Sequence, residues 1–93
     1  MDEAYYKALK TCGERYLEMI HEDIYWEGSP KTWKLCDFIL EFIRGCDDKL
    51  PLMKLNRWLG YIQGCLIERG RTTVEVERDW TRPLFRGLDF TNG

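Results

Sequence analysis

The chain of 93 residues has few of the features that mark catalytic or membrane proteins. It has a single histidine, no Gly-rich phosphate loop, and neither a G-x-S-x-G nor an H-E-x-x-H motif. No apolar run approaches the roughly 20 residues that a helix needs to cross a bilayer. We therefore expect a protein that is not an enzyme, that uses no cofactor and that has no membrane contact.

A secretory signal and paired cysteines are also missing. The first residues, M-D-E-A-Y-Y-K, lack the basic and apolar segments of a signal peptide, so we expect a cytoplasmic location, where disulfides are rare. The four cysteines have no C-x-x-C spacing and match no usual zinc pattern. We interpret them as small buried hydrophobes and expect no metal site. They are Cys12, Cys36, Cys46 and Cys65.

The net charge is small, at −2, but it is unevenly placed. Residues 1–48 carry eleven acidic and six basic side chains, whereas residues 49–93 carry five acidic and eight basic ones. This asymmetry is too mild for a general nucleic-acid binder, so nucleic acid is not an expected partner. Aromatic residues make up 14% of the chain, which supplies bulky core material and argues against disorder.

Apolar residues recur with the 3.6-residue period of helices along most of the chain. This pattern predicts a single all-α domain over residues 1–93, a compact bundle of three main helices plus a short fourth helix and an apolar C-terminal strap. The predicted helices span residues 3–26, 30–44, 51–69 and 73–80, and the tail spans residues 81–93. We favour docking of the apolar tail on its own domain over docking in the groove of a partner.

The first predicted helix carries an acidic ridge. Glu14, Glu18 and Glu22 follow one another at i, i+4 spacing, where like charges repel. We interpret the ridge as a solvated face, and the alternative is a docking ridge for a basic partner. His21 lies beside the ridge and away from the apolar face, so it should be exposed.

The second predicted helix should begin at a clear boundary. Gly28, Ser29 and Pro30 suit the end of one helix, the N-cap of the next and its first residue. The helix is apolar around well over half of its circumference, so we expect it to be central and contacted from at least two sides. A second copy of the chain could provide one of those contacts, which leaves a homodimer open. A polar connection should follow from Gly45 to Leu50.

The segment that follows the third helix has two interpretations. Thr72 and Glu75 have the spacing of a capping box, which predicts a helix from residue 73 with Val76 and Trp80 facing inward. Residues 72–78 also alternate like a strand. No other segment alternates convincingly enough to pair with such a strand, so we favour the helix.

The third predicted helix carries two glycines, Gly60 and Gly64, beside the amides of Asn56 and Gln63. Each glycine costs a helix about 1 kcal/mol relative to alanine, so we expect another backbone or a ligand to approach this shoulder closely. The nearest candidate is the chain's own segment from Trp80 to Phe90. Alternatively, the amides cap or bridge the ends of neighbouring helices, including the turn that carries Asp79 and Arg82, because buried amides need hydrogen-bond partners.

From this shoulder and the segment after it we predict a partner-binding surface. Its residues are Asn56, Arg57, Gly60, Gln63, Gly64, Arg78, Arg82 and Phe85. We interpret the acids of the fourth helix, Glu75, Glu77 and Asp79, as solvated; there they would repel a DNA backbone. A small DNA-binding regulator is therefore the alternative function and not the leading one.

Two motifs occur in order in the C-terminal half, N-R-W-L-G-Y-I-Q-G at Asn56–Gly64 and E-R-D-W-T-R-P-L-F at Glu77–Phe85. In this order the chain resembles small accessory proteins encoded by tailed bacteriophages, over roughly its C-terminal third to half. The resemblance implies a non-enzymatic protein in the cytoplasm of an infected bacterium. Such a protein would bind and modulate or inhibit a host protein, for example in a defence or nucleic-acid-processing complex. The resemblance carries over no catalytic residue.

Overall fold

The computed structural model describes residues 2–26 and 28–88, and these residues fold as an all-α bundle. The helices are α1 (Glu3–Trp26), α2 (Pro30–Asp47), α3 (Leu52–Glu68) and α4 (Val74–Phe85). The all-α class expected from the sequence is confirmed, and the described part of the chain contains no strand. Within the same residues, no helix combines the length and the hydropathy needed to span a membrane.

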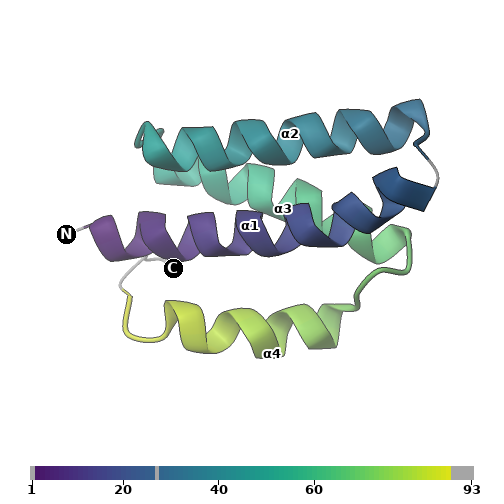
Figure 1. The fold of residues 1–93 in the computed structure, drawn as a ribbon. Helices are drawn as coiled ribbons and strands as arrows, with labels where there is room; N and C mark the ends of the chain where they lie inside the picture. Colours follow the sequence, from purple (N-terminus) through teal and green to yellow (C-terminus); the bar gives the residue numbers. More distant parts are fainter. Residues whose placement is uncertain (1, 27, 89–93) are drawn as a thin grey trace.

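Helix α1 contacts each of the other three helices. It pairs most extensively with α2, α3 packs against both of them, and α4 lies along the opposite side of α1 (Figure 1). The helices that follow one another alternate in direction because short connections join them (Figure 1). The resulting molecule has two unequal parts, a three-helix unit of α1, α2 and α3 and a less embedded α4.

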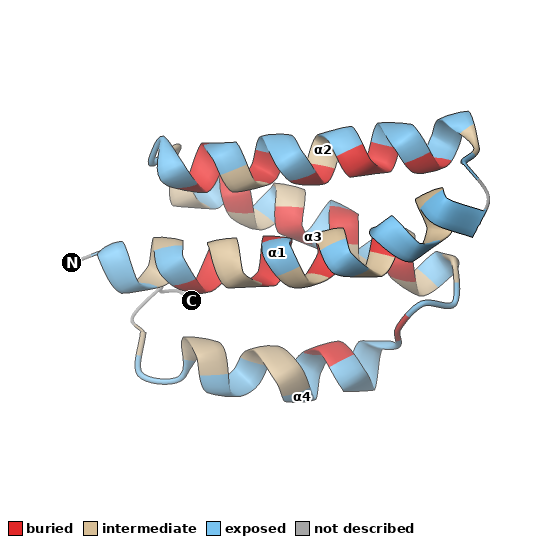
Figure 2. Cartoon of the chain, viewed as in Figure 1, coloured by how far each residue is buried: buried red, intermediate tan, exposed pale blue. Residues whose placement is uncertain are grey.

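The core lies where the apolar faces of α1, α2 and α3 meet (Figure 2). Each fully buried Leu, Ile or Phe side chain contributes roughly 1.5–3 kcal/mol before conformational entropy is subtracted. The largest fully buried apolar and aromatic side chains are Leu9, Tyr16, Ile20, Ile39, Phe42, Leu55, Ile62 and Leu66. Three of the four cysteines, Cys12, Cys36 and Cys46, are buried as small hydrophobes, whereas Cys65 is only half-buried.

The boundary between α1 and α2 has the local chemistry that the sequence predicted. Gly28 adopts a left-handed φ of 65°, and the Ser29 hydroxyl accepts a hydrogen bond from the Thr32 amide, with Pro30 at the first helical position. Gly70, with φ of 76°, ends α3 in the same way. These signals depend on neighbouring residues in the chain, which is why they could be recognised locally.

Helix α2 is longer than predicted, because Gly45 continues the helix and does not end it. The left-handed residue that ends α2 is Lys49, with φ of 59°, and the Leu50 amide donates to the Gly45 carbonyl. This is the hydrogen bond of a Schellman motif, with Leu50 packed on Gly45. A Cβ at Gly45 would lie 2.8 Å from Leu50 Cδ1, so the glycine lets the Leu50 side chain pack closely on the last turn of α2.

Helix α4 differs from its prediction at both ends. Its N-cap is Thr73, whose hydroxyl accepts from the Val76 amide, so the predicted capping box starting at Thr72 is wrong. The helix also continues beyond Trp80 to Phe85 and includes Pro83 in its last turn. Proline there removes one backbone donor on an exposed surface, where water can satisfy the carbonyl left free. The predicted tail therefore begins as helix, and its residues 89–93 lie outside the described part of the chain.

Candidate interaction groove

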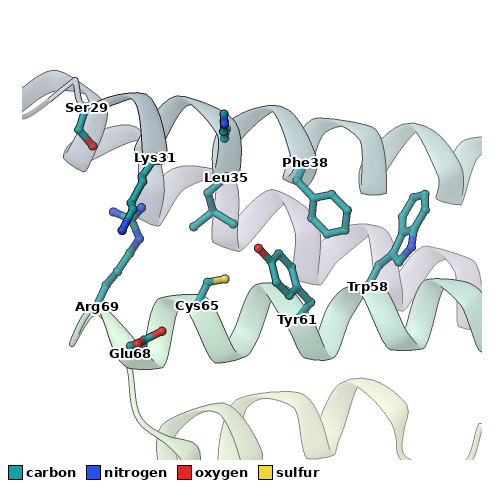
Figure 3. A pocket seen from close by; sticks show the side chains of 10 residues that line it. Ser29, Lys31, Leu35, Phe38, Trp58, Tyr61, Cys65, Glu68 and Arg69 are labelled. Atoms are coloured by element: carbon teal, nitrogen blue, oxygen red, sulfur yellow. The ribbon is translucent and has the colours of Figure 1, made fainter.

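A solvent-open groove runs between α2 and α3, with a cavity volume of about 860 Å³. We call it the α2/α3 groove. Figure 3 shows aromatic side chains from both helices meeting over it, with polar side chains gathered at one end. The residues that line it are Ser29, Lys31, Lys34, Leu35, Phe38, Trp58, Tyr61, Cys65, Glu68 and Arg69.

Helical spacing explains why the apolar floor forms. Trp58, Tyr61 and Cys65 follow one another on α3 at i, i+3 and i+7, so they share one face. The ring of Phe38, on α2, lies between the other two rings (Figure 3), with its centroid 5.3 Å from Trp58 and 5.2 Å from Tyr61. The tilted and edge-to-face angles, 54° and 79°, are the geometries that aromatic pairs prefer. The floor is therefore ordered before any partner arrives, although Tyr61 remains 60% exposed.

The other end of the groove is cationic. Lys31 and Lys34 come from the first two turns of α2. Arg69 reaches toward Lys31 from the end of α3 (Figure 3). The Arg69 guanidinium donates to the Thr32 hydroxyl at 3.1 Å and lies 3.8 Å from an Asp23 carboxylate oxygen. Neither lysine forms an ion pair with any described residue, so their charges are available to a ligand.

A half-buried thiol, Cys65, sits on the groove floor beside Tyr61. The side-chain contact with Cys65 raises the pKa of the Tyr61 hydroxyl, so Tyr61 is neutral near pH 7. Elsewhere, burial raises the pKa of Cys12 to about 12 and that of Cys46 to about 11, which makes these thiols unreactive. The groove thus offers aromatic surface, cations and one accessible thiol, a combination suited to binding apolar and anionic groups.

A second feature, which we call the Glu77 cluster, joins α4 to α1. Glu77 is only 4% exposed and accepts hydrogen bonds from both Arg15 (2.7 and 2.8 Å) and Thr72 (2.5 Å), as well as a short one from the Tyr16 hydroxyl. Gln63 on α3 donates to that same hydroxyl at 2.9 Å. Helices α1 and α4 and the α3–α4 connection therefore meet at one carboxylate, and α3 joins the cluster through the Tyr16 hydroxyl.

The environment of Glu77 sets its charge. Burial alone would raise the pKa of this carboxyl group, but hydrogen bonds from Arg15, Thr72 and Tyr16 outweigh it and hold the pKa below its ordinary value of 4.5. Burial, followed by the hydrogen bond to Glu77, strongly raises the pKa of Tyr16. The cluster is therefore an ionised carboxylate paired with a neutral phenol and a cation.

The expectation that Glu77 is solvated, like Glu75 and Asp79, is wrong. The same correction applies to Val76, predicted to face inward but 48% exposed. Glu77 shares its helix face with Trp80 and Leu84, at i+3 and i+7, and both of these pack against the core. That spacing was the signal that could have identified Glu77 as an inward-facing acid, but polar residues are normally assigned to the outside.

The predicted partner-binding residues fall into separate places. Gly60, Gln63, Gly64 and Arg78 line a shallow hollow of about 330 Å³ between α3 and α4, on a different side of α3 from the groove. Arg57 on α3 and Arg82 on α4 are exposed and do not line this hollow.

The other two predicted residues, Asn56 and Phe85, lie at the opposite end of α3. Asn56 donates to the Leu52 carbonyl and accepts from the Tyr5 hydroxyl at 3.3 Å. The Phe85 ring lies 5.0 Å from that of Tyr5. The amides of Asn56 and Gln63 thus bridge α3 to α1, and neither is hydrogen-bonded to Asp79 or Arg82, which lie within α4 and not in a turn.

For its described part, the expectation that the chain's own C-terminal segment approaches Gly60 and Gly64 closely is wrong. A Cβ at either glycine would meet no atom of the described residues within 4 Å. The described part of the segment packs on α1 instead, where the Arg15 guanidinium lies 4.3 Å from the centroid of Trp80. Close approach occurs at Gly13 of α1, where a Cβ would lie 2.7 Å from the Ile43 side chain of α2.

Comparison of the chain with protein-family models, with curated proteins and with solved structures finds no match. Within residues 2–26 and 28–88, no three His, Cys, Asp or Glu side chains are grouped so that they could hold a metal ion.

Proposed function

We propose that this chain is a non-enzymatic protein-interaction module that binds a helical segment of another protein in the α2/α3 groove. The observation that carries the proposal is the ordered, solvent-open aromatic floor formed by Phe38, Trp58 and Tyr61. Tryptophan and tyrosine in preformed hollows are the residue types that dominate binding energy in protein interfaces. Contact between these exposed aromatic surfaces and water is unfavourable in the free protein, and a partner that covers them removes this cost.

The shape of the groove favours a helix as its occupant. Two neighbouring helices form its walls, and an amphipathic helix fits such a groove by its apolar face. From Trp58 to Arg69 the groove extends for roughly 16 Å, because each helical residue rises about 1.5 Å. That length accommodates about three helical turns, with apolar anchors at i, i+3 or i+4, and i+7.

The resemblance of Asn56–Gly64 and Glu77–Phe85 to accessory proteins of tailed bacteriophages supports a bacterial host protein as the partner. Binding would then modulate or inhibit that protein in the bacterial cytoplasm. A chain with an ordered binding groove would act in this way by occupying a surface that the host protein needs for another interaction.

The proposal can be tested by selecting helical peptides from a displayed library against the purified protein. We expect the selected binders to lose affinity for a Tyr61→Ala variant and to keep it for Tyr25→Ala, because Tyr25 is also an exposed tyrosine but lies outside the groove. Circular dichroism would check that both variants fold. Binders that are insensitive to Tyr61→Ala would contradict the groove as the docking surface.

A further inference from the structure

We infer that the helix bound in the α2/α3 groove is acidic at one end, the end that meets Lys31 and Lys34. This inference rests on the proposed function and adds the charge and the orientation of the partner segment.

The groove is chemically divided along its length. Leu35, Phe38, Trp58 and Tyr61 form its apolar part, whereas Lys31 and the guanidinium of Arg69 project at the other end (Figure 3). An occupant that spans both parts therefore needs apolar anchors followed by a group that suits cations. A wholly apolar helix would leave the two lysines covered without a partner, which costs solvation free energy.

The charge at this end is not balanced within the chain. Among the four charged residues that line the groove, Lys31, Lys34 and Arg69 are cations and Glu68 is the carboxylate. Arg69 already faces Asp23 and donates to Thr32, so its charge is partly compensated. The two lysines form no ion pair with the described residues, and they are the groups left for a ligand.

The start of α2 adds to the same positive potential. A helix N-terminus carries a partial positive charge and is stabilised by acidic residues in its first turn. The first turn of α2 has no acidic residue and contains Lys31 instead. This arrangement is unfavourable for the free chain, and a carboxylate brought by a partner would stabilise it.

A second copy of this chain is not the occupant that these observations favour. The continuous apolar faces of α1, α2 and α3 are buried in the core. The apolar residues on the inward face of α4 pack against that core. The outer side of α2 exposes Trp33 and Leu40, but the charged Asp37 lies between them. The described helices therefore offer no free apolar face three turns long.

The inference can be tested with three fluorescent peptides that share one set of apolar anchors and differ at one end. That end would carry two glutamates, two glutamines or two lysines, and binding would be measured by fluorescence anisotropy. Two exposed ion pairs should make the glutamate peptide bind about three- to tenfold more tightly than the glutamine peptide at low salt. The advantage should shrink at high salt, because screening weakens exposed pairs.

A charge-reversal variant gives the matched comparison. Lys31→Glu/Lys34→Glu should reverse the order of the peptides, whereas Lys7→Glu/Arg86→Glu, with the same change in net charge on exposed sites outside the groove, should keep it. Peptide bound in the groove should also slow alkylation of Cys65, which lies on its floor.

Each outcome separates the inference from the proposed function. Equal binding of all three peptides, with Cys65 protected, would overturn the acidic-end inference and leave the groove as a docking site. If no peptide binds and Cys65 is not protected, the proposed function fails as well. Self-association at the same concentrations, abolished by Lys31→Glu/Lys34→Glu, would identify a second copy as the occupant and overturn the inference.

Discussion

At the scale of single residues, Glu77 links α4 to the rest of the bundle. It is a buried acid that receives hydrogen bonds from α1 and from the α3–α4 connection. Replacing a buried ion pair with apolar groups can be neutral, but removing one partner leaves a charge without compensation. The cluster therefore makes the position of α4 depend on this carboxylate as well as on the apolar contacts of Trp80, Leu84 and Phe85.

Glu77→Gln should lower the free energy of unfolding by about 3 kcal/mol, the lower end of the range for breaking a buried ion pair. The lower end applies because the Arg15 side chain is 21% exposed and keeps some solvation. Glu75→Gln removes the same charge from an exposed position of α4 and should have little effect. Chemical denaturation measures both, and equal losses for the two variants would contradict the role assigned to the cluster.

Glycine positions give a second comparison between residues of the same type. Gly60→Ala should raise the free energy of unfolding by about 0.5–1 kcal/mol, because a Cβ there meets open space and alanine favours helix. Gly13→Ala should lower it by about 1–3 kcal/mol, because the Cβ would overlap the Ile43 side chain. Thermal unfolding of the two variants checks both signs. Destabilisation by Gly60→Ala would show that the shoulder packs against something in the free protein.

At the scale of elements, α4 stands apart from the other three helices. Its one buried side chain is Glu77, and its packing is directed mainly at α1. The predicted helix was correct in kind, yet Thr72 is a donor to Glu77 and not a cap, and Trp80 is not the last helical residue. The ends of a helix depend on packing as well as on local signals, and this explains the difference.

Hydrogen exchange should reveal this difference between elements. Local stability follows the number of buried apolar contacts, so amides of α4 should exchange faster than those of α2 in the native protein. In Glu77→Gln, α4 should lose most of its remaining protection while α2 keeps its own. Uniform loss of protection across all helices would mean that α4 unfolds only together with the rest of the bundle.

At the scale of the whole molecule, stability should be greatest between mildly acidic and mildly alkaline pH. The pKa of Glu77 is lower in the folded than in the unfolded chain, so its contribution is present above pH 4.5 and is lost as the pH falls through the folded pKa. Burial raises the pKa of Cys12 from 9.0 to about 12, so its contribution is present below pH 9 and is lost as the pH rises.

Thermal midpoints measured from pH 3 to pH 11 would check this bell-shaped profile. Glu77→Gln should flatten the acidic side, because the group that titrates is gone, and leave the alkaline side unchanged. An unchanged acidic side in this variant would assign acid sensitivity to other carboxylates.

The sequence by itself determined the helical class, the order of the helices and several of their ends, because 3.6-residue periodicity and signals such as Ser29, Pro30 and Gly70 act between near neighbours. Only the tertiary structure decided which faces meet. It placed Glu77 next to Arg15, 62 residues away, and Phe38 against Tyr61 across two helices. A single helix face cannot specify its partner, since burial and charge pairing depend on atoms that packing brings together from distant parts of the chain.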